Sequence, residues 1–217
     1  MEGMQREDKG MLGNNRGFTL IEIAIVLIII GIIIGAVVKG KDLIRSAEQK
    51  KLYSKFINSW TLAYSAYYDR TGWIMGDDAT NNNATRDGHC GVVAGPASCA
   101  NLVAQLQAVG LEVPAQGPTG SECVRTYTDS QGRNYSLTIV FDYRAAIGNF
   151  VRIYSTNGIA TELGMAWDRI IDEQRSGSAG DLRYTADYTA DPLVFAVWPD
   201  ATAATVANSA AILRLTF

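Results

Sequence analysis

The pattern of apolar and polar residues divides the chain into one wholly apolar segment and a mixed remainder. Residues 18–38, FTLIEIAIVLIIIGIIIGAVV, contain a single charged side chain, that of Glu22. As a helix rising 1.5 Å per residue, this segment would extend roughly 30 Å, the thickness of a bilayer's hydrocarbon core. It is longer than the apolar core of a secretory signal, which has roughly 7–15 residues. The segment therefore predicts a helix that spans a membrane.

Residues 39–70 continue with the periodicity of an amphipathic helix. Apolar side chains recur three or four residues apart, with one longer gap, at Ile44, Ala47, Tyr53, Phe56, Ile57, Trp60, Ala63, Tyr64 and Tyr67. No proline occurs between residues 18 and 70, so we expect a nearly continuous helix over both segments. The aromatic stripe on its second half is typical of a helix face that packs on a sheet.

Beyond residue 71 the composition is that of a globular head. Residues 72–96 are rich in Gly, Asn, Asp and Thr, which predicts an irregular surface loop. The pattern then predicts helices over 98–109, with Ser98 as N-cap, and 161–175; an antiparallel meander of strands over 122–129, 134–143 and 149–154; a flexible polar stretch after residue 180; and strands over 192–199 and 211–217. We therefore predict an α+β fold, with residues 71–217 forming one head whose antiparallel sheet packs on the long helix.

Glu22 is the one charged residue of the apolar segment, and its presence there requires an explanation. A carboxylate at the centre of a membrane helix costs about 2.5–3.5 kcal/mol on insertion scales. The sequence around it, Gly17-Phe18-Thr19-Leu20-Ile21-Glu22, resembles the class III signal of type IV pilins and of the pseudopilins of type II secretion. The resemblance implies that residues 1–17 are a leader, that a prepilin peptidase cuts between Gly17 and Phe18, and that Phe18 is then N-methylated.

The same resemblance implies a pilin-like fold and a structural function. The mature chain would wait in the inner membrane as a single-pass protein with its head in the periplasm. An inner-membrane assembly platform would then add copies of the chain to one another, forming an extracellular pilus. Glu22 would pair with the α-amino group of Phe18 on a neighbouring copy and set the register between them. Two other interpretations remain: a pseudopilin or minor pilin, and a monomeric binding protein held by a single-pass anchor.

Two glycines in the apolar segment, Gly31 and Gly35, lie four residues apart. This spacing allows close approach of helices in a membrane, and glycine is also the residue at which a helix loosens most readily. Glycines are also simply tolerated in membrane helices.

Three cysteines, Cys90, Cys99 and Cys123, lie in the part that would face an oxidising compartment. We expect one disulfide and a buried leftover thiol. We favour Cys90 with Cys99, which would close a short loop and stabilise the head by roughly 2–3 kcal/mol. The alternative is Cys99 with Cys123, which would tie the short helix to the first strand.

Oxygen-bearing side chains are concentrated in the long loop, at Asp77, Asp78, Asn81, Asn83 and Asp87. Such a cluster could hold calcium, although the spacing fits no EF-hand. Turns favour the same residue types, so we predict a solvated loop and no metal site.

The remaining composition argues against several functions. The formal net charge is −3, so no basic surplus indicates a nucleic-acid partner. The sequence has no GxSxG, Walker or HExxH motif, and only one histidine is available as a general base. We therefore predict a protein that is not an enzyme and needs no cofactor.

Overall fold

The computed structural model describes residues 17–77, 86–91, 97–114, 122–201 and 205–215. The chain divides into two compact units, residues 1–44 and residues 45–217, which are described separately. The first contains most of helix α1, Leu20–Leu52. The second contains the end of that helix and the whole head.

The predicted long helix is present, interrupted by one π-helical turn. Helix α1 passes into the π turn Tyr53–Ile57, which passes into α2, Asn58–Thr71. The amide of Asn58 donates to the carbonyl oxygen of Tyr53, five residues earlier, as in a π helix. Gly72 ends α2 with φ of +72°, and its amide donates to the carbonyl of Tyr68 at 2.7 Å.

The longer gap in the apolar stripe, between Ala47 and Tyr53, ends where the π turn begins. A π turn adds one residue to the local repeat and so rotates the helix face that follows. From this turn onward Phe56, Ile57 and Trp60 are at most 1% exposed, while Ala47 is exposed. One turn before it, the buried residue of α1 is Gln49, a polar residue that the apolar periodicity did not identify.

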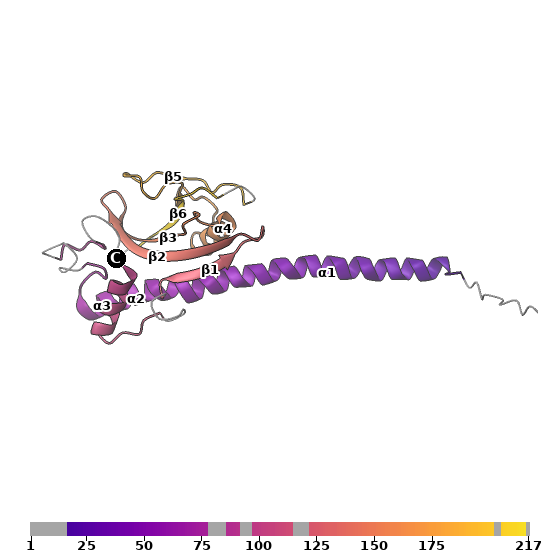
Figure 1. Ribbon diagram of the computed structural model, residues 1–217, viewed down its shortest axis with the longest axis horizontal. Coiled ribbons are helices and arrows are strands. Elements are labelled where there is room, and N and C mark those ends of the chain that lie inside the picture. The colour runs from indigo at the N-terminus through magenta and orange to yellow at the C-terminus, as the bar shows by residue number, and fades with distance from the viewer. Residues whose placement is uncertain (1–16, 78–85, 92–96, 115–121, 202–204, 216–217) are drawn as a thin grey trace, which may run out of the picture. The chain divides into compact units, whose positions relative to one another are not determined.

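The head contains a six-stranded antiparallel sheet (Figure 1). Its strands follow the order β1-β2-β3-β6-β4-β5 and comprise β1 Val124–Thr128, β2 Asn134–Arg144, β3 Gly148–Tyr154, β4 Leu182–Thr185, β5 Phe195–Ala196 and β6 Ala210–Arg214. The predicted three-strand meander is confirmed, with Tyr127 opposite Tyr135 and Val151 opposite Phe141. The α+β architecture is therefore the one that the sequence predicts.

Two predictions about the C-terminal strands are wrong. The stretch after residue 180 contains strand β4, whose Leu182 and Tyr184 are buried, where we expected a flexible segment. Strand β5 has two residues, where we expected a strand over 192–199. That segment begins and ends with proline, which cannot donate to a ladder of backbone hydrogen bonds.

The main core lies between the helices and one face of the sheet. Phe141 on β2 stacks on Tyr64 with ring centroids 5.3 Å apart and meets Trp60 edge-on at 6.3 Å. Alternate residues of β6 point to opposite faces, so Ala211 and Leu213 join this core while Ile212 joins a smaller cluster on the other face. The aromatic stripe of α2 is thus a packing surface.

The described part of the head also contains two shorter helices. Helix α3, Cys99–Ala108, begins at the predicted N-cap, where the Ser98 hydroxyl accepts from the Asn101 amide at 3.3 Å. Helix α4, Thr161–Ile171, ends four residues earlier than we predicted. On α4 the indole of Trp167 donates to the backbone carbonyl of Gln49 at 3.2 Å, which joins residues 118 positions apart.

Candidate functional site

The first residues of the structure form a reciprocal cap on α1. Thr19 precedes the helix, and its amide and hydroxyl each donate to a carboxylate oxygen of Glu22 at 2.8 Å. The amide of Glu22 donates back to the Thr19 hydroxyl at 3.3 Å. This Thr-x-x-Glu arrangement is a capping box, which satisfies amides that a helix N-terminus leaves open. The Thr-x-x-Glu spacing is visible in the sequence alone.

The cap gives Glu22 a hydrogen-bonding partner but not a neutralising one. Thr19 contributes no charge, so this cap does not neutralise an ionised Glu22 carboxylate. A cation from outside the segment would therefore still stabilise it. The expected pairing of Glu22 with a neighbouring Phe18 amine stays a prediction that this geometry permits.

Every large apolar side chain between residues 18 and 38 is at least 46% exposed. Among the described residues, α1 and its continuation form one helix that is long and apolar enough to cross a membrane. Transferring such a side chain out of water is worth about 1.5–3 kcal/mol. Exposure on this scale indicates a surface that lipid or other protein helices cover.

Gly31 and Gly35 make no close contact within the chain. A Cβ atom added at either position would meet no atom within 4 Å. Packing inside this chain therefore does not require glycine at these positions. The predicted roles in helix approach or helix loosening stay predictions, and each concerns what lies outside this segment of the chain.

The predicted cleavage site lies at the start of the described chain. Gly17 and Phe18 precede α1, and Phe18 is 84% exposed. Residues 1–16 of the predicted leader lie outside the described residues. Cleavage after Gly17 and methylation of Phe18 stay predictions.

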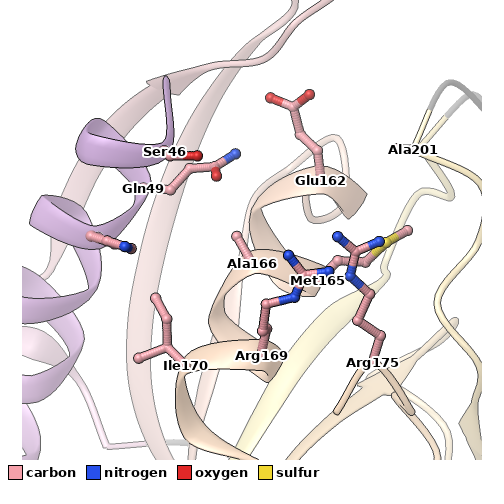
Figure 2. A pocket seen from close by; sticks show the side chains of 10 residues that line it. Ser46, Gln49, Glu162, Met165, Ala166, Arg169, Ile170, Arg175 and Ala201 are labelled. Atoms are coloured by element: carbon pink, nitrogen blue, oxygen red, sulfur yellow. The ribbon is translucent and has the colours of Figure 1, made fainter. Parts of the chain in front are cut away.

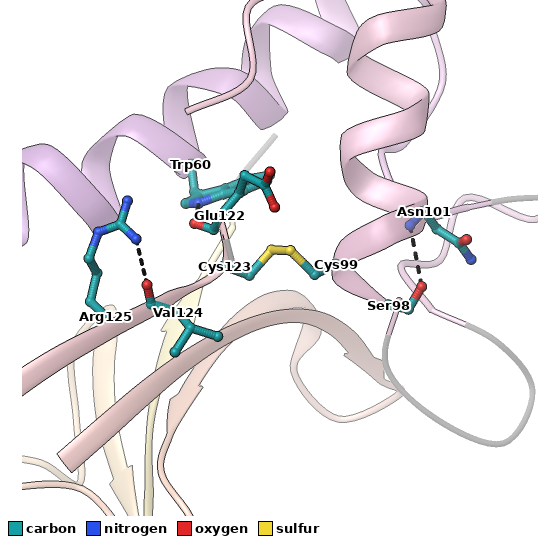
Figure 3. Close-up of a disulfide and its surroundings, with 8 residues drawn as sticks. All are labelled: Trp60, Ser98, Cys99, Asn101, Glu122, Cys123, Val124 and Arg125. Carbon is teal, nitrogen blue, oxygen red and sulfur yellow. Dashed lines mark hydrogen bonds between the residues drawn. A yellow bond between two sulfur atoms is a disulfide. The ribbon is translucent and has the colours of Figure 1, made fainter. Parts of the chain in front are cut away.

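The disulfide joins Cys99 to Cys123 across a sequence separation of 24 residues (Figure 3). The favoured pairing of Cys90 with Cys99 is therefore wrong, and the structure has the alternative pairing. The N-terminus of α3 lies against the start of β1, where the two Cα atoms are 5.9 Å apart. Beside the disulfide the indole of Trp60 donates to the Glu122 carbonyl at 3.3 Å, which fixes this corner on α2.

Cys90 is a free thiol and is 3% exposed, in agreement with the predicted burial of the leftover cysteine. Its sulfur donates to the hydroxyl of Tyr64, and burial raises the pKa of the thiol to about 12. The thiol is therefore neutral at physiological pH and chemically unreactive. Cys90 points into the core beneath α2, which explains why it does not reach Cys99.

Two of the five calcium candidates lie in the described part of the loop. Asp77 is 1% exposed, and its carboxylate accepts from the backbone amide of Gly88 at 2.7 Å and of Asp87 at 3.4 Å. Asp77 thus closes the base of the loop through hydrogen bonds. Asp78, Asn81 and Asn83 lie outside the described residues, within which no three His, Cys, Asp or Glu side chains converge on a common point.

Comparison with known proteins identifies the N-terminal segment. Residues 12–38 match the family described as "Prokaryotic N-terminal methylation motif". No curated protein and no solved structure matches the chain. The match covers Gly17, Phe18 and Glu22 together with the whole apolar segment, so the resemblance noted from the sequence is confirmed over these residues. The chain therefore carries at residues 12–38 the methylation motif that forms the class III signal of type IV pilins and pseudopilins.

Proposed function

We propose that the chain is a structural subunit of a type IV pilus, with adhesion, motility or a related surface function. The observation that supports this most strongly is the combination of the methylation motif with an apolar helix exposed on all sides. A motif of this kind implies processing by a prepilin peptidase. An apolar surface that surrounds a helix needs a cover, first lipid and then the helices of neighbouring subunits.

Localisation and partners follow from the same proposal. The precursor lies in the inner membrane with its head in the periplasm, and an assembly platform there transfers it to the growing filament. The disulfide between Cys99 and Cys123 supports this orientation, because such bonds persist in oxidising compartments. The head has a packed aromatic core and a capped helix, and we assign it a structural rather than an enzymatic role.

Glu22 has two roles in this proposal. Within its own chain it completes the capping box with Thr19. Between chains its remaining charge pairs with the α-amino group of Phe18 on the neighbouring subunit. Neutralising both charges removes the penalty that either would carry in an apolar filament core.

Electron microscopy of sheared surface fractions, with mass spectrometry of the N-terminal peptide, tests the function. We expect filaments whose subunit begins at methylated Phe18. Processed protein found in the membrane fraction without filaments would instead indicate a pseudopilin or minor pilin. A chain that still begins at Met1 would contradict the whole assignment and leave a membrane-anchored monomer.

Three substitutions separate the steps. Gly17→Val should block cleavage, so a mature-sized band on a denaturing gel would disprove the cleavage site. Glu22→Ala should leave insertion and cleavage intact and abolish filaments. Glu22→Gln keeps an oxygen that can complete the capping box while it removes the charge. If Glu22→Gln assembles normally, the carboxylate acts only as a cap and the proposed charge pair does not exist.

A further inference from the structure

A pocket of about 260 Å³ lies in the head between the end of α1 and helix α4 (Figure 2). Lys50 on α1 contributes to one wall, and Arg169 on α4 and Arg175 beyond it contribute to the other. Figure 2 shows the side chains of Arg169 and Arg175 extending into the pocket beside Met165. None of the three cations has an ion-pair partner among the described residues.

One acidic side chain, Glu162, lines the described part of this pocket, and its carboxylate is already engaged. It accepts from the Tyr127 hydroxyl and from the Ser130 amide at 3.0 Å, and Arg45 lies 3.8 Å away. Glu162 therefore does not balance the charges of Lys50 and the two arginines. The pocket has a positive surplus that an incoming anion would reduce.

The floor of the pocket is apolar. Met165, Ala166 and Ile170 come from α4, and Ile170 is 37% exposed. A side chain or segment that fills this pocket should therefore combine negative charge with apolar surface.

The same chain presents a surface of that chemistry on residues 187–197. Asp187 and Asp191 are exposed, and Val194 and Val197 are 68% and 69% exposed. The segment itself contains no lysine or arginine, and two arginines lie over its rings: Arg183 over Phe195 at 5.1 Å and Arg152 over Tyr188 at 4.7 Å. Arg152 is paired with Asp142, so Arg183 is the cation that offsets part of the charge of the two aspartates. The segment leads into and past β5, which is an edge strand of the sheet and so is accessible to another chain.

Hydrogen bonds within the segment favour the ionised form of Asp187. The Asp187 carboxylate accepts from the Thr189 amide at 2.9 Å and from its hydroxyl at 2.6 Å. These hydrogen bonds lower the pKa of Asp187, so the carboxylate stays ionised at physiological pH.

We propose that the basic pocket of one subunit docks against the acidic and apolar segment 187–197 of a second copy of this chain and takes up a side chain of that segment. The proposal rests on the proposed filament function. The two surfaces are different patches of one chain, so their contact is heterologous, and repeating it produces an open filament rather than a closed dimer. Charge complementarity between the pocket and the segment would also favour this register over others.

A charge exchange in the full-length chain, expressed in the native host, tests the contact. The first variant is Arg169→Glu/Arg175→Glu, and the second is Asp187→Arg/Asp191→Arg. The third combines all four substitutions. Lys51→Glu/Lys55→Glu is the matched control, because it makes the same charge change at helix positions outside this pocket. The amount of sheared filament is measured for each, together with processing and the melting temperature of the detergent-solubilised chain.

We expect each of the first two variants to reduce filaments at least about tenfold, because like charges would then face each other. The combined variant should restore them to within about twofold of the wild type, and the control should assemble normally. Normal assembly of either charge-reversed variant would overturn the proposal. So would loss of filaments that the combined variant, folded and processed, does not restore. If the unmodified chain forms no filament, the proposed function itself fails, which is a distinguishable result.

Discussion

The disulfide offers a direct test of the head's structure, because the pairing that we favour from the sequence differs from the pairing in the structure. Cys123→Ser removes the bond between Cys99 and Cys123, which closes a loop of 24 residues. In the chain-entropy picture a loop of this length stabilises the folded state by about 3.5 kcal/mol. For a domain of this size each kcal/mol corresponds to about 2–4 °C in melting temperature. We therefore expect Cys123→Ser to lower the melting temperature by about 7–14 °C.

Cys90→Ser is the matched control. Serine keeps a donor for the Tyr64 hydroxyl and leaves the disulfide intact, so the free energy of unfolding should fall by only about 1 kcal/mol. The assay is thermal unfolding of the detergent-solubilised chain, followed by circular dichroism, with and without reductant. Reductant should lower the melting temperature of the wild type and of Cys90→Ser, and should have no effect on Cys123→Ser.

The opposite pattern would refute this reasoning. If reductant destabilised Cys123→Ser but not Cys90→Ser, the bond would join Cys90 to Cys99. Alkylation of the folded chain adds a second check. The buried Cys90 thiol should react slowly in the native state and readily after unfolding, because its pKa is raised to about 12.

Three further substitutions probe the head. Asp168 is fully buried, which raises the pKa of its carboxyl group, while its carboxylate accepts from the Trp198 indole at 2.8 Å. The folded state then holds this proton to higher pH than the unfolded state, so stability falls as pH rises from about 4 through the raised pKa. Asp168→Asn should therefore gain stability relative to the wild type as pH rises in melting experiments from pH 4 to 8, and a constant difference would contradict this. Gly164→Ala would place a Cβ atom 2.2 Å from the Trp198 ring. We therefore expect the free energy of unfolding, measured with denaturant, to fall by about 1–3 kcal/mol. An unchanged denaturation midpoint would show that the ring moves away without cost. Asp142→Ala would leave the buried Arg152 guanidinium without the carboxylate that lies 2.9 Å away. We expect the free energy of unfolding to fall by about 3–5 kcal/mol in the same assay. A fall of less than about 1 kcal/mol would show that water solvates the guanidinium and would contradict this reasoning.

Local rules account for much of the fold. Ser98 caps α3 as predicted, because an N-cap depends on residues only a few positions apart. The first three strands pair as predicted, because short connections place consecutive strands side by side. Strand β4 is not predictable in this way, because its four residues are too short a run to show a clear alternation and it pairs with β6, which is distant in the sequence.

The candidate sites also differ in whether the sequence alone identifies them. The motif around Gly17, Phe18 and Glu22 is recognisable without a structure, since its residues are contiguous. Thr19 belongs to it as the partner of Glu22, and its spacing could have been recognised from the sequence. The basic pocket could not be recognised from the sequence, because Lys50 and Arg169 are far apart in the chain. They line one pocket only because α4 packs beside the end of α1.

The sequence by itself determined that residues 18–38 are long and apolar enough to cross a membrane, and it determined the nature of the N-terminal signal. Length and composition suffice for the first, because a bilayer selects for a continuous apolar surface whatever its detailed packing. Only the tertiary structure decided which cysteines pair, which polar residues of the helix are buried, and where positive charge gathers. These features depend on contacts between distant residues, such as the Trp167 indole and the Gln49 carbonyl, whose partners are set by how the whole core packs.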